Sequence, residues 1–387
     1  MIIKPAERLN IVQEYYFSKK LREIGEMNKS GKNVINLGIG SPDMPPSNNV
    51  INVLQNQAQR KDIHGYQSYN GIFELRDAFA KWYKRYYNVE LNPDNEILPV
   101  FGSKEAIIFI SMAFLNEGDE VLVPDPGYPT YSSVSQLVQA KIRTYNLKEE
   151  NNWYPDFYEI EKQDISKVKL MWVNYPNMPT GAPASIELFE SLVNFALKHN
   201  ILICNDNPYS FLNEKPISIL SIKNAKECAI ELNSLSKSHN MAGWRIGVIA
   251  ASNDYLSTII KVSSNVHSGM FYAMQKAAVE ALNLPDSWYK ELNNTYDFRR
   301  KAVFKIFDYL NCAYNTNQKG LFVWAKINDK YKNAEILSDI ILNEANVFIT
   351  PGFIFGKNGE NYLRISLCSD IEIFNEALSR IKKIQSI

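Results

Sequence analysis

Apolar segments of two kinds alternate along most of the chain and predict an α/β fold. Short apolar runs, typical of buried strands, start near Ile97 and recur as far as residue 250. Longer segments with apolar positions at helical spacing separate these runs, and the clearest cover residues 104–118, where Gly118 is expected to close the helix, and residues 185–200. The alternation predicts a mostly parallel sheet buried on both faces by helices.

The pattern changes after about residue 285. A long amphipathic segment over residues 287–311 leads into short strand-like and helical runs, which predict a smaller α+β unit. The N-terminal stretch up to about residue 45 lies outside the alternating pattern and is expected to pack on this unit. We therefore predict a large domain over residues 46–285 and a small domain formed by residues 1–45 and 286–387.

Composition and charge narrow the class of ligand. The 42 basic residues balance 42 acidic ones, so no positively charged surface for a nucleic acid or a membrane is expected. The N-terminus lacks the apolar core of a signal peptide, and no apolar run approaches the roughly 18 residues of a membrane span. The four cysteines show neither metal-ligand spacing nor a CxxC pair. We expect a soluble, cytoplasmic protein that binds small molecules and holds no metal.

One lysine after a strand-like run is a candidate for covalent chemistry. Lys237 lies in "NSLSKSHNMAGWRIG", eight residues before Arg245. A lysine attacks a carbonyl only when burial or neighbouring cations favour loss of its proton, and this setting offers both. Taken alone, an exposed loop lysine explains the same pattern.

A carboxylate and a phenol follow an earlier apolar run. Asp206 ends "ILICND" and Tyr209 comes three residues later. The carboxyl end of a central parallel strand is where α/β sheets bind ligands, and a carboxylate buried there needs a cationic partner. A protonated pyridine nitrogen is such a partner for Asp206, and Tyr209 is then placed to contact the ring's phenolic oxygen. The simpler alternative for Asp206 is a helix N-cap.

Contacts for a phosphate and for an aromatic ring are also present. Gly102 and Ser103 lie at a strand-to-helix turn, where free N–H groups and the helix dipole favour an anion. Ser234 and Arg245 add a hydroxyl and a charge. Tyr128, after the next strand, is a candidate to stack on the ring. Each of these motifs also has a simpler explanation: Gly102 and Ser103 could form an ordinary helix cap, and Tyr128 could be a core residue. The prediction of a cofactor site rests on their combination.

These segments resemble the class I and II aminotransferases, enzymes of fold type I that depend on pyridoxal phosphate. "SLSKSHNMAGWRIG" is similar to the family's S-x-[ST]-K…R-x-G segment, which implies that Lys237 forms a Schiff base with the cofactor and that Arg245 binds its phosphate. Asp206 and Tyr209 match D-x-x-Y, which implies contacts to the pyridine nitrogen and the ring oxygen. The resemblance covers nearly the whole chain, and further candidates to bind the cofactor within it are Lys104 and Ser236.

Other segments extend the resemblance to the substrate and to a second subunit. "INLGIGSPDMPP" resembles the G-x-P-D motif and implies that Gly40 lines the substrate carboxylate site. "GENYLRISL" implies that Arg364 binds the α-carboxylate, although a solvated strand residue is an alternative. "YQSYNGIFELR" implies that Tyr66 reaches the phosphate of the neighbouring subunit, and hence a homodimer. The segments "GSKEAI", "YYFSKKLREI" and "SNVHSGMFYAMQKAAVEAL" resemble diaminopimelate-type and broad amino-acid aminotransferases.

One position departs from the family pattern. The family usually reads N-P-T-G, with an asparagine that donates to the ring oxygen, whereas "NYPNMPTG" has Met178 there. A thioether donates no hydrogen bond. Tyr209 alone could serve the oxygen, Asn177 or Asn174 could substitute, or the cofactor site could be damaged; the first interpretation fits the other intact motifs. We expect the lost donor to raise the pKa of the lysine–cofactor imine relative to an asparagine-bearing relative.

The resemblance implies a reaction as well as a fold. Lys237, Asp206 and Tyr209 are its expected catalytic residues, and they would move an amino group between an L-amino acid and a 2-oxo acid with ping-pong kinetics. A carbon–sulfur lyase would use the same residues. A cofactor-binding regulatory module is the third alternative, and it would show no turnover. The sequence leaves the amino donor open, because a few pocket side chains decide it.

Overall fold

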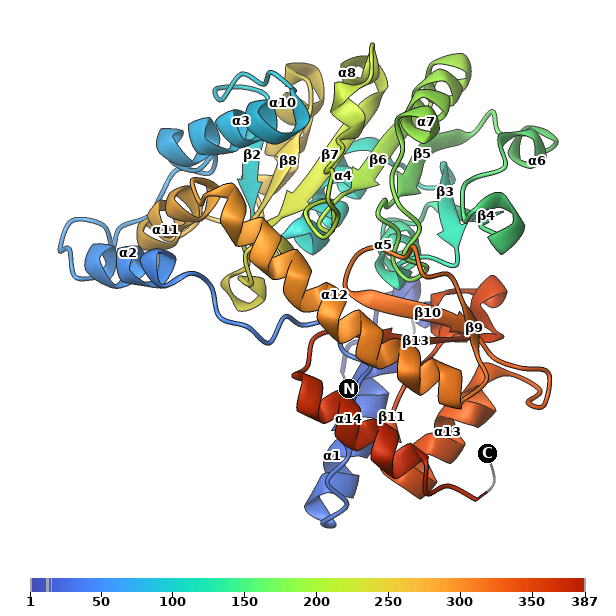
Figure 1. Cartoon of the computed structure of the whole chain (residues 1–387). Helices are drawn as coiled ribbons and strands as arrows, with labels where there is room; N and C mark the ends of the chain where they lie inside the picture. The colour runs from blue at the N-terminus through green and yellow to red at the C-terminus, as the bar shows by residue number, and fades with distance from the viewer. Residues whose placement is uncertain (1, 12–13, 15, 386–387) are drawn as a thin grey trace.

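The computed structural model describes residues 2–11, 14 and 16–385. Residues 1, 12–13, 15 and 386–387 of the predicted small domain therefore lie outside the description. The main sheet has seven strands in the order β2-β8-β7-β6-β5-β3-β4, and helices cover both of its faces (Figure 1). Its strands are β2 (Ile97–Val100), β3 (Glu120–Asp125), β4 (Lys141–Asn146), β5 (Val168–Val173), β6 (Leu202–Asp206), β7 (Ala229–Ser234) and β8 (Gly247–Ala250).

The sheet is mostly parallel, with one reversed strand near its edge. Strands β4, β3, β5, β6 and β7 pair in parallel, whereas β8 runs antiparallel to both β7 and β2. The carboxyl ends of β6 and β7 consequently meet at one edge of the sheet. That edge is where an open α/β sheet accommodates a ligand.

Burial on both faces follows from the period of two along each strand. In β5, Leu170 and Trp172 pack into the core beneath α4, α5 and α10. Met171 and Val173 face the second and larger core. The helices of this part of the chain are α2 (Asn48–Ala58), α3 (Phe73–Tyr87), α4 (Ser103–Phe114), α5 (Pro129–Leu137), α6 (Phe157–Glu161), α7 (Ile186–His199), α8 (Ala225–Cys228), α9 (Leu235–Ser238), α10 (Asn253–Ser263) and α11 (Tyr272–Leu282).

Helix α4 ends earlier than the sequence suggested. The predicted segment 104–118 is helical only as far as Phe114, and Leu115 is already extended. The carboxylate of Asp119 accepts from the N–H of Asn116 at 2.8 Å, which stabilises a turn in place of another helical turn. Gly118 lies in this turn with a φ of 85° and does not close the helix.

A smaller unit joins the two ends of the chain. Its antiparallel sheet has the order β12-β13-β10-β9, and β1 pairs in parallel with β11. Helix α12 runs from the side of the large sheet down to this unit (Figure 1). The elements are α1 (Tyr16–Lys29), β1 (Ile35–Asn36), α12 (Asp286–Tyr309), β9 (Ala313–Tyr314), β10 (Phe322–Lys326), α13 (Ala334–Ala345), β11 (Val347–Phe348), β12 (Thr350–Pro351), β13 (Tyr362–Ser366) and α14 (Ile371–Ile381).

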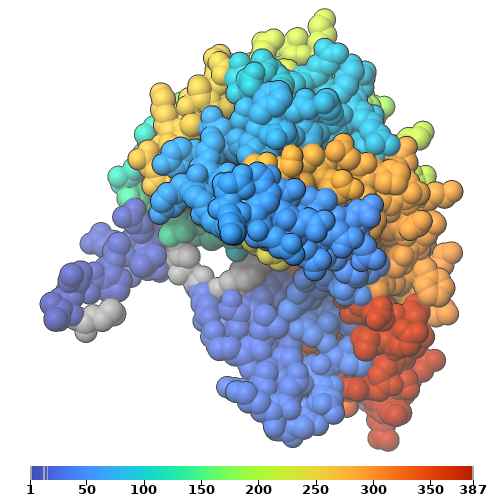
Figure 2. Space-filling model, turned by 90° about the vertical axis from the view of Figure 1, so that its left-hand side faces the viewer, coloured from blue at the N-terminus to red at the C-terminus, as the bar shows by residue number. Residues whose placement is uncertain are grey.

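The first residues of the chain extend outward from the body of the molecule (Figure 2). Within this arm, the 3-10 helix η1 (Glu7–Asn10) has no buried residue. Ile2, Ile3, Leu9 and Ile11 expose half or more of their surface. None of the helices in the described part of the chain has the length and apolar character needed to cross a bilayer.

Candidate active site

A cavity of about 600 Å³ lies between the carboxyl ends of β6 and β7 and the small unit. The cavity lining contains all the predicted site residues except Gly102 and Tyr66. Gly102 lies next to the guanidinium of Arg245, which does line the cavity. The predicted residues in its lining are Gly40, Ser103, Lys104, Tyr128, Asp206, Tyr209, Ser234, Ser236, Lys237, Arg245 and Arg364.

Lys237 projects into this cavity from the short helix α9. Ser234 ends β7 and caps α9, because its hydroxyl accepts from the N–H of Ser236 at 3.2 Å. The cap turns the chain sharply, so that Lys237 Nζ reaches the carbonyl oxygen of Gly40 at 2.5 Å. Burial lowers the pKa of Lys237, and the positive charges of Arg364 and Arg245 act in the same direction. The amine is therefore easier to deprotonate than an ordinary lysine.

Asp206 ends β6 and is buried, and one of its two carboxylate oxygens has no hydrogen-bond partner within the described residues. Its Oδ2 accepts from the Tyr131 hydroxyl at 2.9 Å. Its Oδ1 has no hydrogen-bond partner within the described residues. Burial raises the pKa of Asp206 to about 6, and the bond from Tyr131 opposes that rise. A carboxylate in this environment is incomplete until a donor or a cation lies beside it.

The start of α4 and Arg245 form a second polar group of the cavity. Gly102 precedes α4 with a φ of 90°, and a Cβ there would lie only 2.3 Å from Arg245 Nη2. Glycine is required both for this conformation and for the close approach of the guanidinium. Arg245 donates to the carbonyl oxygens of Ala242 and Phe101 at 3.0 and 3.2 Å. A helix N-terminus beside an arginine favours an anion.

Arg364 and the chain near Gly40 form the opposite end of the cavity. Arg364 lies on β13, is 4% exposed and donates through Nη2 to the carbonyl oxygen of Gly38 at 2.7 Å. Its guanidinium carbon lies 3.9 Å from the centre of the Phe322 ring and 4.5 Å from that of Phe355. A Cβ on Gly40 would lie 2.3 Å from the Phe322 ring, so glycine lets this ring pack under the arginine.

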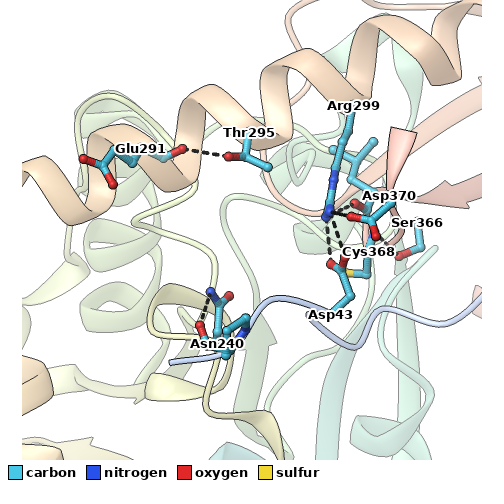
Figure 3. Close-up of polar contacts among 10 residues, drawn as sticks. Asp43, Asn240, Glu291, Thr295, Arg299, Ser366, Cys368 and Asp370 are labelled. Carbon is cyan, nitrogen blue, oxygen red and sulfur yellow. Dashed lines mark hydrogen bonds and ion pairs between the residues drawn. The ribbon is translucent and has the colours of Figure 1, made fainter. Parts of the chain in front are cut away.

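Arg299 of α12 connects the two chain segments at this end (Figure 3). Its Nη1 and Nη2 donate to the two carboxylate oxygens of Asp43, both at 2.7 Å. The same guanidinium donates to the carbonyl oxygen of Leu367 at 3.1 Å and to Asp370 at 2.9 Å. Asp43 follows the Gly38–Gly40 segment, and Leu367 follows β13. Arg299 therefore fixes the position of the Gly38–Gly40 segment relative to Arg364.

Tyr66 lies apart from the other predicted residues. It is 94% exposed and does not line this chain's cavity. Neighbouring apolar side chains are also exposed, with Tyr69 at 47% and Phe73 at 51%.

Comparisons with known proteins agree with this geometry. The family described as aminotransferase class I and II matches residues 32–381. The chain is 39% identical to the LL-diaminopimelate aminotransferase of Aquifex aeolicus, over 98% of this chain and 99% of that protein. It is 36% identical to the enzyme of the same name from Dehalococcoides mccartyi, over 99% and 100% of the two chains.

The chain belongs to the class I and II aminotransferase family. Among solved structures, substrate-bound BacF from Bacillus subtilis is similar with a TM-score of 0.94 and 34% identity, over 99% of this chain and 98% of that one. The aspartate aminotransferase of Thermus thermophilus with maleate has the same fold, with a TM-score of 0.91 at 23% identity and coverage of 99% and 100%. The aspartate-aminotransferase-like architecture and the aminotransferase activity predicted from the sequence are confirmed.

Aminotransferases of this family use pyridoxal phosphate, and the residues of the cavity fit that group. The unused Oδ1 of Asp206 suits a protonated ring nitrogen. Lys237 supplies an amine whose pKa is lowered, and the glycine turn beside Arg245 suits a phosphate. The ring, the aldehyde and the phosphate of the cofactor each have a matching group in this aminotransferase.

Met178 contacts Arg364 in this aminotransferase. The Met178 sulfur accepts from Arg364 Nη1 at 3.3 Å, and Met178 is 7% exposed at the wall of the cavity. The position therefore offers the ring oxygen no donor, and its side chain is turned toward the substrate end of the site.

The two asparagines near Met178 each form hydrogen bonds with neighbouring backbone groups. Asn174 donates through its side-chain amide to the backbone oxygen of Asp206, and its Oδ1 accepts from the N–H of Met178 at 2.7 Å. Asn177 donates to the carbonyl oxygen of Asn174 at 3.1 Å and is absent from the described cavity lining. Asn177 therefore does not substitute at the ring oxygen. Asn174 lines the cavity and its amide carries a second hydrogen, so it stays an alternative to Tyr209, the residue that we expect to contact the ring oxygen.

Several residues of the site were missed in the sequence. Tyr131 lies on α5, three residues after Tyr128, which is the extended N-cap residue of that helix. The two rings pack edge to face with their centres 5.5 Å apart. Asn174 was considered in the sequence only as a substitute for the missing donor at Met178. It directly follows β5, the strand beside β6, so the strand-end rule also applies to it. Phe17 and Leu21 line the cavity from α1. Their segment, "YYFSKKLREI", showed a family resemblance but no role in the site, because only the folded chain brings α1 to the cavity.

Proposed function

We propose that this aminotransferase moves the amino group of an L-α-amino acid to a 2-oxo acid in two half-reactions, with Lys237 as the residue that attaches the cofactor as a Schiff base. The observation that carries the proposal is the position of Lys237, whose side chain lines the same cavity as the buried Asp206 and Arg364 and is influenced by the charges of both. One amine is thereby within reach of both the cofactor end and the substrate end.

Bound pyridoxal phosphate supplies an aldehyde that condenses with amines and a protonated ring that withdraws electrons from the substrate. Asp206 keeps the ring nitrogen protonated, because an ionised carboxylate beside it stabilises the positive charge. Tyr131 holds the other carboxylate oxygen at 2.9 Å and so fixes the orientation of Asp206. This pair of residues sets the electronic character of the site.

Lys237 then moves the proton. With cofactor and substrate bound, the free Nζ of Lys237 would accept the proton of the substrate α-carbon and would donate it again later in the half-reaction. The lowered pKa of Lys237 supports this role, since the neutral amine is the form that accepts a proton. The carbonyl oxygen of Gly40 holds Nζ on this side of the cavity.

Arg364 binds the substrate α-carboxylate with paired, charge-assisted hydrogen bonds. Its two terminal nitrogens already contact Gly38 and Met178, which fix the plane of the guanidinium. Fixing the carboxylate at one end and the amine at the other leaves the α-hydrogen directed toward Lys237. The same arginine serves the oxo acid of the second half-reaction, so we expect ping-pong kinetics.

We further propose that the working form is a homodimer with shared sites. Tyr66 is almost fully exposed, and Tyr69, Phe73 and the apolar N-terminal arm are exposed with it. A second copy that covers these side chains would remove apolar area from water and bring Tyr66 to the partner's phosphate site. Sedimentation of the holoenzyme and of the Tyr66→Phe variant tests the dimer, and both are expected to be dimeric. The variant is also expected to bind the cofactor more weakly, which a cofactor titration measures.

A reducing compartment such as the cytoplasm suits the thiols of this chain. All four cysteines are free, and Cys204, Cys228 and Cys312 are buried. Burial raises the pKa of Cys204, Cys228 and Cys312, which keeps them protonated.

A single-turnover experiment tests the proposed reaction. Holoenzyme mixed with one amino acid and no oxo acid is expected to convert its cofactor to the amine form and to release one equivalent of 2-oxo acid. Release of pyruvate and ammonia without conversion of the cofactor would instead indicate a carbon–sulfur lyase. Lys237→Ala is the control, because it should bind the amino acid and release no oxo acid.

A further inference from the structure

The turn that carries Lys237 ends at a buried histidine. Helix α9 has only four residues and forms a single turn, which is too short to be stable on its own. His239 is its C-cap residue, and the His239 N–H donates to the carbonyl oxygen of Leu235 at 3.2 Å. The side chain of His239 is 1% exposed and does not belong to the described cavity lining. Any influence of His239 on the reaction must therefore pass through α9.

Both ring nitrogens of His239 have a hydroxyl partner. Nδ1 lies 2.8 Å from Oγ of Ser238, and Nε2 lies 3.0 Å from the hydroxyl of Tyr289. The Tyr289 oxygen also accepts from the indole N–H of Trp82 at 2.9 Å. On the other side, Ser238 Oγ lies 3.3 Å from the carbonyl oxygen of Ser234. These four contacts form a continuous chain from α3 to the end of β7.

One protonation state of the imidazole supplies a proton to all four contacts. An indole N–H only donates, so the Tyr289 oxygen accepts from it and keeps its own proton for Nε2. A carbonyl oxygen only accepts, so Ser238 donates its single proton to Ser234. Ser238 Oγ can then accept from Nδ1, which must carry the ring proton. With the proton on Nε2 instead, Ser238 would have one proton for two acceptors.

The surroundings keep this imidazole neutral and its bonds dry. Burial lowers the pKa of His239 to about 3, and the Ala281 backbone opposes that effect only in part. Trp82, Tyr289 and Ser238 are each 7% exposed or less. Water is therefore not available to replace a lost partner, and a broken contact would leave a buried polar group unsatisfied.

Helix α12 holds the same turn from a second direction. The indole N–H of Trp288 donates to the carbonyl oxygen of Ser238 at 2.9 Å. The next residue of α12, Tyr289, reaches the hydroxyl of Ser238 through His239. Lys237 directly precedes Ser238, so a shift of Ser238 would move the backbone from which the lysine side chain starts.

We propose that His239 is a positioning residue for the amino transfer. As a neutral imidazole with its proton on Nδ1, it transmits the contacts of α3 and α12 to α9 and so fixes where Lys237 Nζ lies. A base held in the wrong place transfers a proton more slowly, even where the substrate still binds. The role of His239 rests on the proposed function of Lys237, whereas its protonation state can be measured without any reaction.

Nuclear magnetic resonance of the holoenzyme with ¹⁵N in its four histidines tests the protonation state. Long-range proton–nitrogen correlations distinguish a protonated ring nitrogen from an unprotonated one, and His239→Asn identifies the His239 signals by their loss. We expect a proton on Nδ1 and none on Nε2, also at about pH 5, where an ordinary histidine is charged. A proton on Nε2, or on both nitrogens, would overturn the inference and leave the amino transfer intact.

Removal of one hydroxyl tests the effect on Lys237. Tyr289→Phe keeps the ring but removes the donor to Nε2. It is expected to lower the maximal rate of the first half-reaction about three- to tenfold, with less than about a twofold change in the half-saturating donor concentration. The rate is followed by cofactor absorbance with the fastest donor among the common L-amino acids and LL-diaminopimelate.

Tyr145→Phe is the matched control for this variant. Tyr145 is equally buried, and its hydroxyl donates to the carbonyl oxygen of Trp172 at 2.7 Å, on strands β4 and β5 and away from α9. Its loss also removes one buried hydrogen bond, but the rate of the half-reaction is expected to stay unchanged. Equal rate losses in Tyr145→Phe and Tyr289→Phe, or no loss in Tyr289→Phe, would overturn the positioning role.

Amide side chains separate the functions of the two ring nitrogens. His239→Asn keeps a donor close to the position of Nδ1 and Ser238, whereas His239→Gln places its amide near the position of Nε2. The asparagine variant is expected to react at least about threefold faster than the glutamine variant. The reverse order, or equal rates, would show that the contact to Ser238 does not position Lys237. No half-reaction of the wild type with any donor would contradict the amino transfer itself, and the positioning role with it.

Discussion

The two ends of the cavity are assembled in different ways. At the cofactor end, Asp206 ends β6, and Lys237 and Arg245 lie in the segment that connects β7 to β8 of the same sheet. At the substrate end, Arg364 contacts Gly38, 326 positions away along the chain. The cofactor end is held by the sheet itself, whereas the substrate end is held by side chains that connect distant segments.

This difference indicates how each end should respond to mutation. The cofactor end carries buried groups whose charge the reaction uses, so changes there should lower kcat. The substrate end fixes where the carboxylate binds, so changes there should raise KM. Kinetic variants of the two ends can therefore support or break the comparison.

The largest expected effect is on kcat at the cofactor end. Asp206→Asn removes the charge that stabilises the protonated ring and should lower kcat by about 10²- to 10³-fold with little change in KM. Tyr131→Phe removes one neutral hydrogen bond to the same carboxylate and should cost no more than about tenfold. Steady-state kinetics with cofactor in excess measure both. A raised KM with normal kcat in Asp206→Asn would contradict the claim that the cofactor end controls kcat and the substrate end controls KM.

The next effect is on KM at the substrate end. Arg364→Gln removes a charge-assisted contact to the α-carboxylate and should raise KM roughly 10- to 100-fold. Cofactor binding by the same variant, measured by absorbance titration, should stay normal. If Arg364→Gln lost cofactor as well, the two ends would not be separable.

A smaller effect is expected from Asp43, which does not enter the cavity lining. Asp43→Asn weakens the paired bonds from Arg299 and should raise KM about three- to tenfold through misplacement of the Gly38–Gly40 segment. Asp370→Asn alters the same arginine, but its side chain is 76% exposed against 28% for Asp43, so less than about a twofold change is expected. Equal kinetics for both variants would assign Arg299 a purely structural role. Thermal unfolding distinguishes a loss of stability from a shift in KM.

The smallest effect concerns Met178, where the two ends meet. Met178→Asn restores a donor toward the ring oxygen and should lower the pKa of the lysine–cofactor imine by about half a unit to one unit. The sign follows because a donor stabilises the deprotonated form. Absorbance titration of wild type and variant measures the pKa. An unchanged or raised value would contradict the hypothesis.

Much of the cofactor end could be predicted from the sequence, because local rules control it. Strand β6 begins with the apolar run Leu202–Cys204, and β7 carries apolar Ile230 and Leu232 between buried polar residues. The residues at the carboxyl ends of such strands meet at one edge of a parallel sheet. Strand β4 was missed because it lies at the sheet edge with exposed polar residues such as Lys141 and Asn146, so it lacks the apolar run that marked its neighbours.

The substrate end was predicted only through the family resemblance, and then in part. Gly40 and Arg364 matched motifs that imply a role. Phe17 and Leu21 lie in a segment that resembled the family without implying a role in the site, and Arg299 belongs to a helix whose pattern predicts only amphipathic packing. Their contacts depend on how the chain ends fold back onto the large sheet. The contact between Met178 and Arg364 likewise joins segments 186 positions apart, beyond the reach of local patterns.

The central claim is that one amine, Lys237 Nζ, carries the cofactor. Reduction of the holoenzyme with borohydride, followed by proteolysis and peptide mapping, tests it most directly. The label is expected on the peptide that contains Lys237, at about one equivalent per chain, and absent in Lys237→Ala. Label on another lysine, or an unmodified position 237 in the reduced holoenzyme, would contradict the account.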